Sequence, residues 1–191
     1  MLVLHRYLLM QNDEASFGHY FQWGRWDDGH QLPNSSSITA STSLQNPSHI
    51  SSGNPNFIIG TTTTTSWWGT GGNASDTWNG TTATATNGKD PCTAIGPGWH
   101  LPSSAEWTNV INAEVIGDAA SAFGSNLKLT ESGYRNSNNG SMVPNFVGGY
   151  YWTSNAANNN VANNLFFDNV YNVLITQTGR GYGFPCRCVK D

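Results

Sequence analysis

The stretch PGWHLPSSAEW, residues 97–107, contains the most definite local structural signal in this sequence. Ser103 stands three residues before Glu106, which is the spacing of a capping box. In that motif the serine hydroxyl accepts a hydrogen bond from the glutamate amide, and the glutamate accepts one from the serine amide. The apolar residues that follow recur at helical spacing: Trp107, Val110, Ile111 and Val115. The pattern predicts a helix of about three turns from near Ser104 to near Gly117.

The rest of the C-terminal half predicts one more helix and a series of strands. Residues 118–124, DAASAFG, are typical of a second, shorter helix. Four later stretches are short, aromatic or β-branched, and separated by Asn and Gly, as strands are: GGYYWTS (148–154), LFFDN (165–169), VYNVLIT (170–176) and GFPCRCV (183–189). Helices followed by an antiparallel β meander predict an α+β domain.

The N-terminal half is less regular. Residues 1–16 are interpreted as an N-terminal extension or a truncated lead-in, because the apolar opening is too short for a signal peptide and has no small-residue cleavage site. Residues 17–29 predict a short strand followed by a turn, and residues 32–89 a long insertion rich in Ser, Thr, Asn and Gly. Trp67, Trp68 and Trp78 are expected to hold this insertion on the body of a single domain, residues 17–191.

Composition narrows the classes of function. The 191 residues suffice for one domain, only 10% of them are charged, and the formal net charge is -4. A nucleic-acid partner requires clustered Lys and Arg, which this chain lacks. No apolar stretch is as long as a membrane span. No following GK[ST] turns the GTGGN segment into a phosphate-binding loop, and we predict no cofactor.

The three cysteines predict one disulfide and one free thiol. Cys186 and Cys188 are two positions apart in a predicted strand, which places their Cα atoms roughly 6.5–7 Å apart on one face. That distance is at or beyond the upper limit for a disulfide, so Cys92 is expected to pair with one of the two. No CxxC motif or paired histidine spacing accompanies them, and we predict no metal site.

Several motifs, taken together, resemble one known family. They are FGHYFQWGRWDDGHQ (17–31), GKDPC (88–92), PGWHLPSSAEW (97–107), GYYWTS (149–154) and GFPCRCVKD (183–191). In this combination and at these separations the chain resembles the Fibrobacter succinogenes major paralogous domain family over nearly all of residues 17–191. That family is similar to the formylglycine-generating-enzyme type of C-type lectin-like domain, in which a similar LPxxAEW helix start and a terminal GF-x-x-R strand recur.

The resemblance implies a C-type lectin-like fold with a long loop-rich insertion and with the two chain ends close together. It also implies the disulfide Cys92–Cys188, because these positions commonly carry cysteine in the family. Cys186 stands where the family more often has an aliphatic residue, and this departure leaves the pairing open.

The asparagine-rich stretch from 155 to 164 carries a second resemblance, to the variable proteins of diversity-generating retroelements, which use the same scaffold. Their mechanism mutates adenines, so an AAC asparagine codon can change at its first two positions but keeps its final C. A codon that ends in C never encodes Lys, Glu, Gln, Trp or Met. Residues 155–184 contain none of these except Gln177. The alternative is ordinary loop chemistry, because Asn tolerates left-handed turn geometry. Either interpretation predicts an exposed loop at the asparagine tract.

The resemblance implies that residues 155–184 form a ligand-facing surface. By the two-residue period of a strand, Leu165 and Phe167 are expected to point inward and Asn164, Phe166 and Asp168 outward. Aromatic residues supply contact area and amides adaptable hydrogen bonds. The predicted ligand contacts are Tyr151 and Trp152 at the edge, with Asn155, Asn158, Asn159, Asn160, Asn163, Asn164, Phe166, Asp168, Asn169, Tyr171, Asn172, Leu174 and Thr176.

The predicted function is a non-catalytic ligand-binding or adhesin domain, on a cell surface, outside the cell or on a phage particle. The ligand would be a protein or a carbohydrate, bound by several copies of the domain because one site alone binds weakly. One alternative is an enzyme of the formylglycine-generating type, which needs a reactive cysteine pair. Another is a calcium-dependent lectin, although no EPN or QPD tripeptide is present. Its oxygen donors would be Asp27 and Asp28 beside His30, or Asp168 with Asn169.

Overall fold

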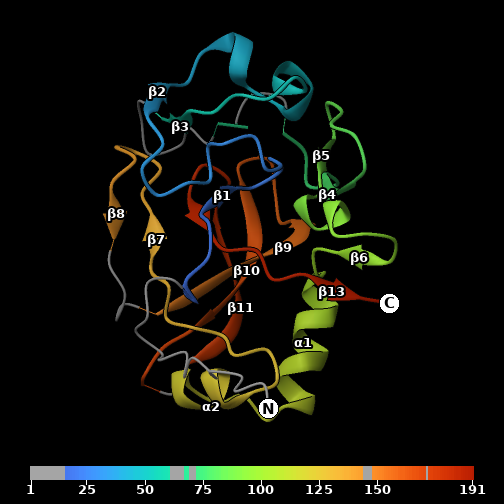
Figure 1. Cartoon of the computed structure of the whole chain (residues 1–191), viewed down its shortest axis with the longest axis vertical. Helices are drawn as coiled ribbons and strands as arrows, with labels where there is room; N and C mark the ends of the chain where they lie inside the picture. The colour runs from blue at the N-terminus through green and yellow to red at the C-terminus, as the bar shows by residue number, and fades with distance from the viewer. Residues whose placement is uncertain (1–15, 61–66, 69–71, 144–147, 171) are drawn as a thin grey trace, which may run out of the picture.

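A five-stranded sheet lies at the centre of the fold, and helices and loops cover it (Figure 1). The computed structural model describes residues 16–60, 67–68, 72–143, 148–170 and 172–191. The strand order is β11-β10-β9-β4-β5, and its strands are β4 (Thr77–Gly80), β5 (Asn87–Lys89), β9 (Gly149–Ala156), β10 (Val161–Phe167) and β11 (Val173–Gly179). Strands β9, β10 and β11 form the predicted antiparallel meander. The prediction of an α+β fold is confirmed at this level.

Two helices lie toward the bottom of Figure 1, and the longer one packs against β9, β10 and β11. Helix α1 (Ser104–Ala113) begins at the predicted capping box, in which Ser103 Oγ accepts from the Glu106 amide and Glu106 accepts from the Ser103 amide at 2.8 Å. Helix α2 (Ala119–Gly124) is capped by the Asp118 side chain. Both helix starts depend on contacts between close neighbours in the sequence, which is why the sequence predicts them.

Helix α1 ends about one turn earlier than predicted. Val115 has a φ of 53°, which breaks the helix, and it is 80% exposed instead of lying on the buried face. The next residue turns back instead: the Ile116 amide donates to the Ile111 carbonyl at 3.0 Å, and the Ile116 side chain is buried. Ile116 therefore takes the core position that helical spacing assigns to Val115.

A second sheet brings together segments near both ends of the described chain. Its order is β1-β12-β7-β8, from β1 (Phe21–Gln22), β7 (Tyr134–Arg135), β8 (Met142–Val143) and β12 (Gly183–Phe184). In the register between β1 and β12, Phe21 lies opposite Phe184. The last predicted strand, 183–189, is interrupted: residues 185–188 have no strand structure, and β13 (Val189–Lys190) pairs separately with β6 (Trp99–His100).

The long segment from 32 to 89 contains only short regular elements where it is described. These are β2 (Ser37–Thr39) and β3 (Phe57–Ile59), which pair in parallel, the single turns at Thr42–Leu44 and Pro47–Ile50, and strands β4 and β5. Trp67, Trp68 and Trp78 are completely buried, as predicted. They pack with Trp23, whose ring centroid lies 5.1 Å from that of Trp68. The segment is thus part of the core.

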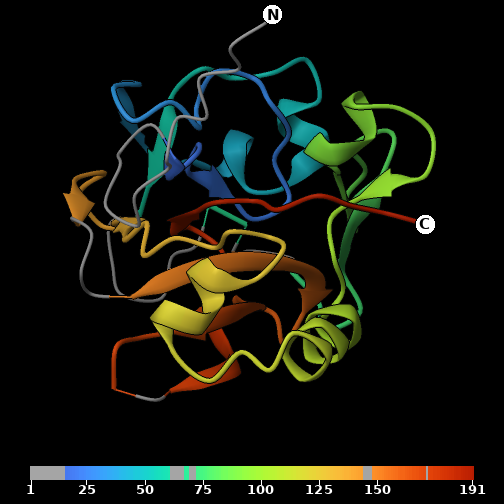
Figure 2. The same ribbon diagram turned by 60° about the horizontal axis from the view of Figure 1, so that its bottom comes forward.

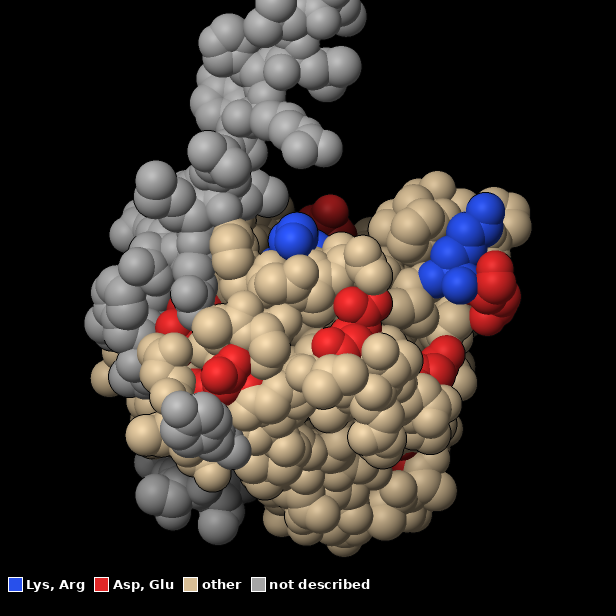
Figure 3. Space-filling model, turned by 90° about the horizontal axis from the view of Figure 1, so that it is seen from below, with Lys and Arg blue, Asp and Glu red and all other residues tan. Residues whose placement is uncertain are grey.

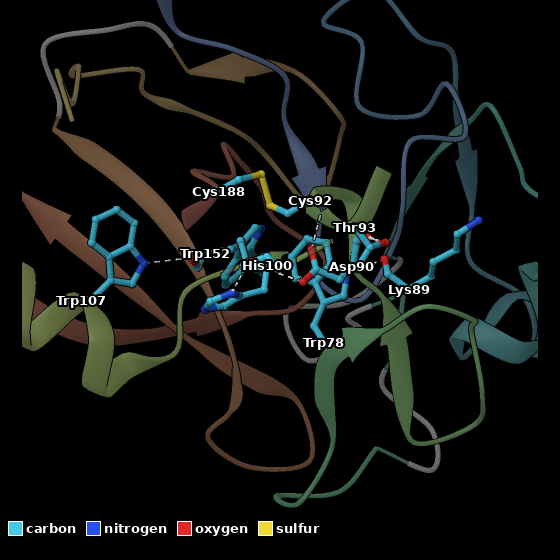
Figure 4. The surroundings of a disulfide bond; sticks show 11 residues. Trp78, Lys89, Asp90, Cys92, Thr93, His100, Trp107, Trp152 and Cys188 are labelled. Carbon is cyan, nitrogen blue, oxygen red and sulfur yellow. Dashed lines mark hydrogen bonds between the residues drawn. A yellow bond between two sulfur atoms is a disulfide. The ribbon is translucent and has the colours of Figure 1, made fainter. Parts of the chain in front are cut away.

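The disulfide joins Cys92 to Cys188, as the resemblance implied, and Cys186 remains a thiol. Cys92 lies on the short turn Pro91–Ala94, and Cys188 reaches it from the C-terminal segment (Figure 4). The Cys92 amide donates to Asp90 Oδ1 at 2.8 Å, and Asp90 Oδ2 accepts from the Leu101 amide. The bond therefore ties the C-terminal segment to the turn that precedes α1.

The described residues include no helix that is long and apolar enough to cross a membrane. Residues 1–15 of the predicted N-terminal extension lie outside the described part of the chain.

Candidate ligand-binding surface

Helix α1 lies on one face of the meander β9–β10–β11, which is buried over β9 and β10 and half-buried along β11 at Val173 and Ile175. Leu165 and Phe167 point into this face and are completely buried, as the two-residue period predicts. They pack with Tyr151 and with Trp107 of α1, and the Phe167 ring stacks on the Tyr151 ring at 6.1 Å. The buried part of this face has no room for a ligand.

The opposite face is covered in the middle and partly open toward β11. Phe166 lies there opposite Leu174, and its ring centroid is 5.1 Å from that of Tyr150. Phe166 and Tyr150 are half-buried, whereas the Leu174 side chain is 43% exposed. Thr176, half-buried, is on the same face two residues farther along β11. We call these four residues, Tyr150, Phe166, Leu174 and Thr176, the aromatic face.

Two tyrosines from distant parts of the chain extend the aromatic face. The ring centroid of Tyr134, on β7, lies 5.3 Å from that of Tyr150 and 5.6 Å from that of Tyr182, and each pair of rings meets at a steep angle. Tyr134 and Tyr182 are half-buried. Burial, together with the nearby Tyr134 and Asp168, raises the pKa of Tyr150, so its phenol stays a neutral hydrogen-bonding group. Tyr150 and Tyr151 are neighbours in a strand and so point to opposite faces, which could have indicated Tyr150 as a residue of the open face. No local pattern places Tyr134 or Tyr182 beside it.

Three predicted contacts are wrong as surface residues, because Tyr151, Trp152 and Asn164 are buried. The Tyr151 hydroxyl accepts from the Thr130 amide at 2.9 Å under the α1 side of the sheet. Trp152 Nε1 donates to the Phe21 carbonyl at 2.7 Å. A strand period assigns residues to two faces, but whether a face meets solvent depends on what covers it. Here the second sheet covers Trp152.

Asn164 shares the covered part of that face. Its Oδ1 accepts from Thr178 Oγ1 of β11 at 2.9 Å, and its Nδ2 donates to the Leu165 carbonyl at 3.3 Å. An amide that is completely buried must find such partners. Asn164 is therefore a structural residue of the sheet and does not reach solvent.

The asparagine tract is mostly strand, so the prediction of an exposed loop over residues 155–164 is wrong. β9 continues through Ala156 and β10 begins at Val161, which leaves only residues 157–160 as the connection. In this turn Asn158 Oδ1 accepts from the Asn160 amide at 2.9 Å and from the Val161 amide at 3.1 Å. Asn158, Asn159 and Asn160 are exposed there.

Two further asparagines of the tract are half-buried in strands. Asn155 Oδ1 accepts from the Ser104 amide at 2.9 Å and so helps to hold the start of α1. Asn163 Nδ2 donates to the Ala156 carbonyl at 3.4 Å across the hairpin. Each amide thus has a partner within the fold.

The predicted contacts around 168–172 lie in the other connection of the meander. Asp168 Oδ1 accepts from the amides of Val170 at 2.9 Å and Asn172 at 3.1 Å, which orders this turn. Asn169 Nδ2 donates to the Glu131 carboxylate, and Asn172 is exposed. Tyr171 lies outside the described residues.

The predicted contacts therefore divide into separate groups. The turns 157–160 and 168–172 are at opposite ends of β10, and a seven-residue strand is about 23 Å long. No single small ligand could touch both turns. Of the predicted residues, the fold brings Phe166, Leu174 and Thr176 together on one partly open surface.

A polar groove of about 450 Å³ lies elsewhere, between β6, the start of α1 and the end of β9. His100 Nε2 lies 2.7 Å from Glu106 Oε1, and His100 Nδ1 lies 3.5 Å from Asp191 Oδ1. The hydrogen bond to Glu106 raises the pKa of His100. Because Glu106 also closes the capping box, the pair orders the entry to the helix, the role that local sequence favours over metal binding.

The oxygen donors considered for calcium have partners inside the fold. Asp28 Oδ2 lies 3.0 Å from Arg25 Nη2, Asp28 Oδ1 lies 2.5 Å from His30 Nδ1, and Asp27 accepts from Gln31. Asp168 accepts the turn amides. Among the residues that the structure describes, no group of three or more His, Cys, Asp or Glu side chains is placed to hold a metal ion.

The cysteines do not form a reactive pair in the described part of the chain. Cys188 is in the disulfide with Cys92. Burial raises the pKa of the Cys186 thiol well above its usual value, and Asp90 raises it further, so Cys186 stays protonated and is a poor nucleophile.

The molecular surface carries few ionic groups on the side seen in Figure 3. Acidic side chains are scattered over it, basic ones are fewer, and most of the described surface is uncharged. A ligand on this side would meet few charged groups.

Comparisons of the chain with protein-family models, with curated proteins and with solved structures gave no match.

Proposed function

We propose that this chain is a non-catalytic ligand-binding domain, an adhesin or receptor-binding module, whose ligand site is the aromatic face. The observation that carries the proposal is the partly open cluster of Tyr150, Phe166 and Leu174 beside neutral hydrogen-bonding groups. Half-buried aromatic residues on a rigid sheet supply contact area at a small cost in conformational entropy. Binding energy at interfaces is concentrated in a few such residues.

The proposed fold is the C-type lectin-like fold of the formylglycine-generating-enzyme type. Three features support it: the capped helix at the LPSSAEW motif, the pairing of β1 with β12 near the two ends of the described chain, and the disulfide between Cys92 and Cys188. A disulfide that closes a long loop is typical of proteins in oxidising compartments. We therefore place the domain outside the cell, on a cell surface or a phage particle.

We further propose that residues 155–184 vary by retroelement-directed mutation. The ladders of β10 with β9 and β11 hold the backbone of this segment, so exposed side chains on it can change without loss of those hydrogen bonds. Sequencing of the native locus tests this proposal. AAC codons at the asparagines, and a nearby repeat that differs only at adenines, would support it, whereas mixed codons without a repeat would contradict it.

A binding screen with three variants tests the ligand site. The domain, displayed in several copies on streptavidin, would be applied to a glycan array and to intact bacterial cells. For any probe that is bound, Leu174→Ser and Phe166→Ala should weaken binding by at least about tenfold, as loss of a central aromatic or apolar contact does. Asn159→Ser, at the far turn, is the matched surface control and should leave binding unchanged.

Two outcomes would contradict the proposed site. Binding that survives both aromatic-face variants would place the ligand elsewhere. Binding that falls equally with Asn159→Ser would show that the effect is not specific to the aromatic face. Because Phe166 is half-buried, a thermal melt of each variant separates loss of binding from loss of folding.

A further inference from the structure

Strand β11 is the outer edge of the five-stranded sheet (Figure 2). It pairs with β10 in one continuous register from Val173 to Gly179, without a bulge. Among the described residues no strand lies on its other side. An edge of this kind presents a row of backbone donors and acceptors to any extended chain that approaches it.

Hydrogen bonds just beyond the two ends of the ladder show which backbone groups point outward. The Arg180 amide donates to the Asn160 carbonyl at 3.1 Å, and the Asp168 amide donates to the Asn172 carbonyl at 3.1 Å. In an antiparallel pair the bonded residues alternate, so even-numbered residues of β11 bond to β10. Val173, Ile175 and Gln177 therefore direct their N–H and C=O groups away from β10, and no described residue bonds to them.

The composition of this edge favours pairing. Native proteins usually protect an exposed edge with Lys, Pro, an inward-pointing charge or a bulge. The sequence VLITQTG has none of these, and four of its seven residues are β-branched. Its side chains carry no charge, so two copies of the strand can face one another without repulsion between like charges.

We propose that β11 pairs antiparallel with β11 of a second copy of this chain, which joins two five-stranded sheets into one. Outward groups must meet outward groups, so odd-numbered residues pair with odd-numbered residues. Full overlap of the strand then centres the two-fold axis on Thr176: Ile175 lies opposite Gln177 of the second copy, and Thr176 lies opposite itself.

This geometry has a functional consequence. A two-fold axis perpendicular to a sheet keeps equivalent side chains on the same face, so the Leu174 and Thr176 side chains of both copies would lie on one face, with Thr176 beside Thr176 and Leu174 opposite Thr178 of the second copy. The dimer thereby presents two aromatic faces in one direction, which makes binding bivalent if that face binds ligand. The dimer itself does not depend on the proposed ligand site.

The expected association is weak. Pairing of one short strand, with little side-chain contact around it, buries less than the roughly 1,200 Å² of a stable specific interface. We therefore expect a dimer that forms at high protein concentration and dissociates on dilution.

The test compares two variants at one position by sedimentation velocity over a wide range of protein concentration. Gln177→Pro removes an outward N–H, and therefore two hydrogen bonds from the symmetric dimer, while the bonds to β10 come from its neighbours. Gln177→Ala keeps the N–H and is the matched control. Wild type and Gln177→Ala should dimerise, and Gln177→Pro should raise the dimer dissociation constant by at least about tenfold, equivalent to the loss of a few hydrogen bonds.

Amide hydrogen exchange gives a second, residue-level measurement. The amides of Val173, Ile175 and Gln177 should gain protection as the protein concentration rises. The amides of Leu174, Thr176 and Thr178, which bond to β10, should be protected at every concentration. The same protection in Gln177→Pro would show that this variant folds.

Three results would overturn the proposal. One is a wild type that stays monomeric at the highest concentration, even if an added extended peptide binds the edge. Another is a dimer in which the amides of Val173, Ile175 and Gln177 remain unprotected. The third is equal dimerisation of Gln177→Pro and Gln177→Ala.

Discussion

The loop-rich region before α1 and the meander β9–β10–β11 satisfy their backbone groups in different ways. In the meander, continuous ladders pair the strands, and the side chains are free to serve packing or the surface. The described loops between residues 17 and 100 have few ladders, so turn hydrogen bonds and buried side chains supply partners for their backbone. Buried backbone groups rarely remain unpaired, whatever the local structure.

Three buried arginines make several of these contacts. Arg25 donates to the Asn54 and Asn56 carbonyls. Arg135 donates to the Leu32 and Ser35 carbonyls, and Arg180 donates to those of Asn73 and Asn158. Desolvation lowers the pKa of Arg25 and Arg135 to about 10, yet both stay charged at neutral pH. The loops are thus held by specific polar contacts, which makes them less tolerant of substitution than the surface of the meander.

The largest expected effect is at Arg180, which forms a fully buried ion pair with Asp76 at 2.6 Å. Arg180→Met keeps much of the side-chain volume but leaves the Asp76 carboxylate without its cation. Breaking one side of a buried pair costs about 3–5 kcal/mol. Denaturant unfolding measures this loss, with Lys190→Met at the exposed position of β13 as the control. A loss below about 1 kcal/mol would show that the loops do not depend on this residue.

Removal of the disulfide should have a slightly smaller effect. Cys92 and Cys188 are separated by 96 positions, so the bond restricts a long loop of the unfolded chain. The double variant Cys92→Ala/Cys188→Ala should lose about 2–4 kcal/mol in denaturant unfolding. Cys186→Ala, which keeps the bond, should lose less. An equal loss in both variants would contradict a role for the crosslink.

The buried His30 should make the loop region sensitive to acid. Desolvation, with the nearby Arg25, lowers the pKa of His30 to about 3, although Asp28 opposes this shift. The unfolded chain therefore takes up a proton below about pH 6.5, while the folded protein does not until about pH 3. Stability falls as the pH falls through this window, by on the order of 2 kcal/mol at pH 5.

The variant His30→Gln isolates this contribution. Its side-chain oxygen can replace Nε2 as the acceptor for the Gln22 amide, so the unfolding free energy should vary less between pH 7 and about pH 5. His49→Gln, at an exposed position, should keep the wild-type pH profile. The same slope in wild type and His30→Gln would assign the acid sensitivity to other groups.

The smallest expected effect is at the exposed hairpin turn of the meander. Asn159 is exposed, so Asn159→Ser should change the unfolding free energy by less than about 0.5 kcal/mol. Asn158→Ala should cost about 1 kcal/mol, because it removes the acceptor of two turn amides. A large loss at Asn159 would contradict the view that the meander tolerates surface change.

Local features of the fold could be predicted from the sequence. Which residues are buried by distant segments could not. The capping box at Ser103 and Glu106 involves residues three positions apart, and the inward direction of Leu165 and Phe167 follows from the strand period alone. Trp152 and Asn164 obey the same period, yet both are buried: Trp152 packs against strands from near both ends of the described chain, and Asn164 is held by Thr178 of β11. Tyr134 and Tyr182 belong to the aromatic face for the same non-local reason.

The sequence by itself determined the helix starts, the meander and the choice of residues for each strand face, because all of these depend on neighbours within a few positions. A family resemblance, and not spacing, singled out Cys188 over Cys186 as the partner of Cys92. Only the tertiary structure decided that the asparagine tract is largely strand, and that its two turns lie at opposite ends of β10. It also decided that one face of the sheet stays partly open, because exposure depends on which distant segments pack against a residue.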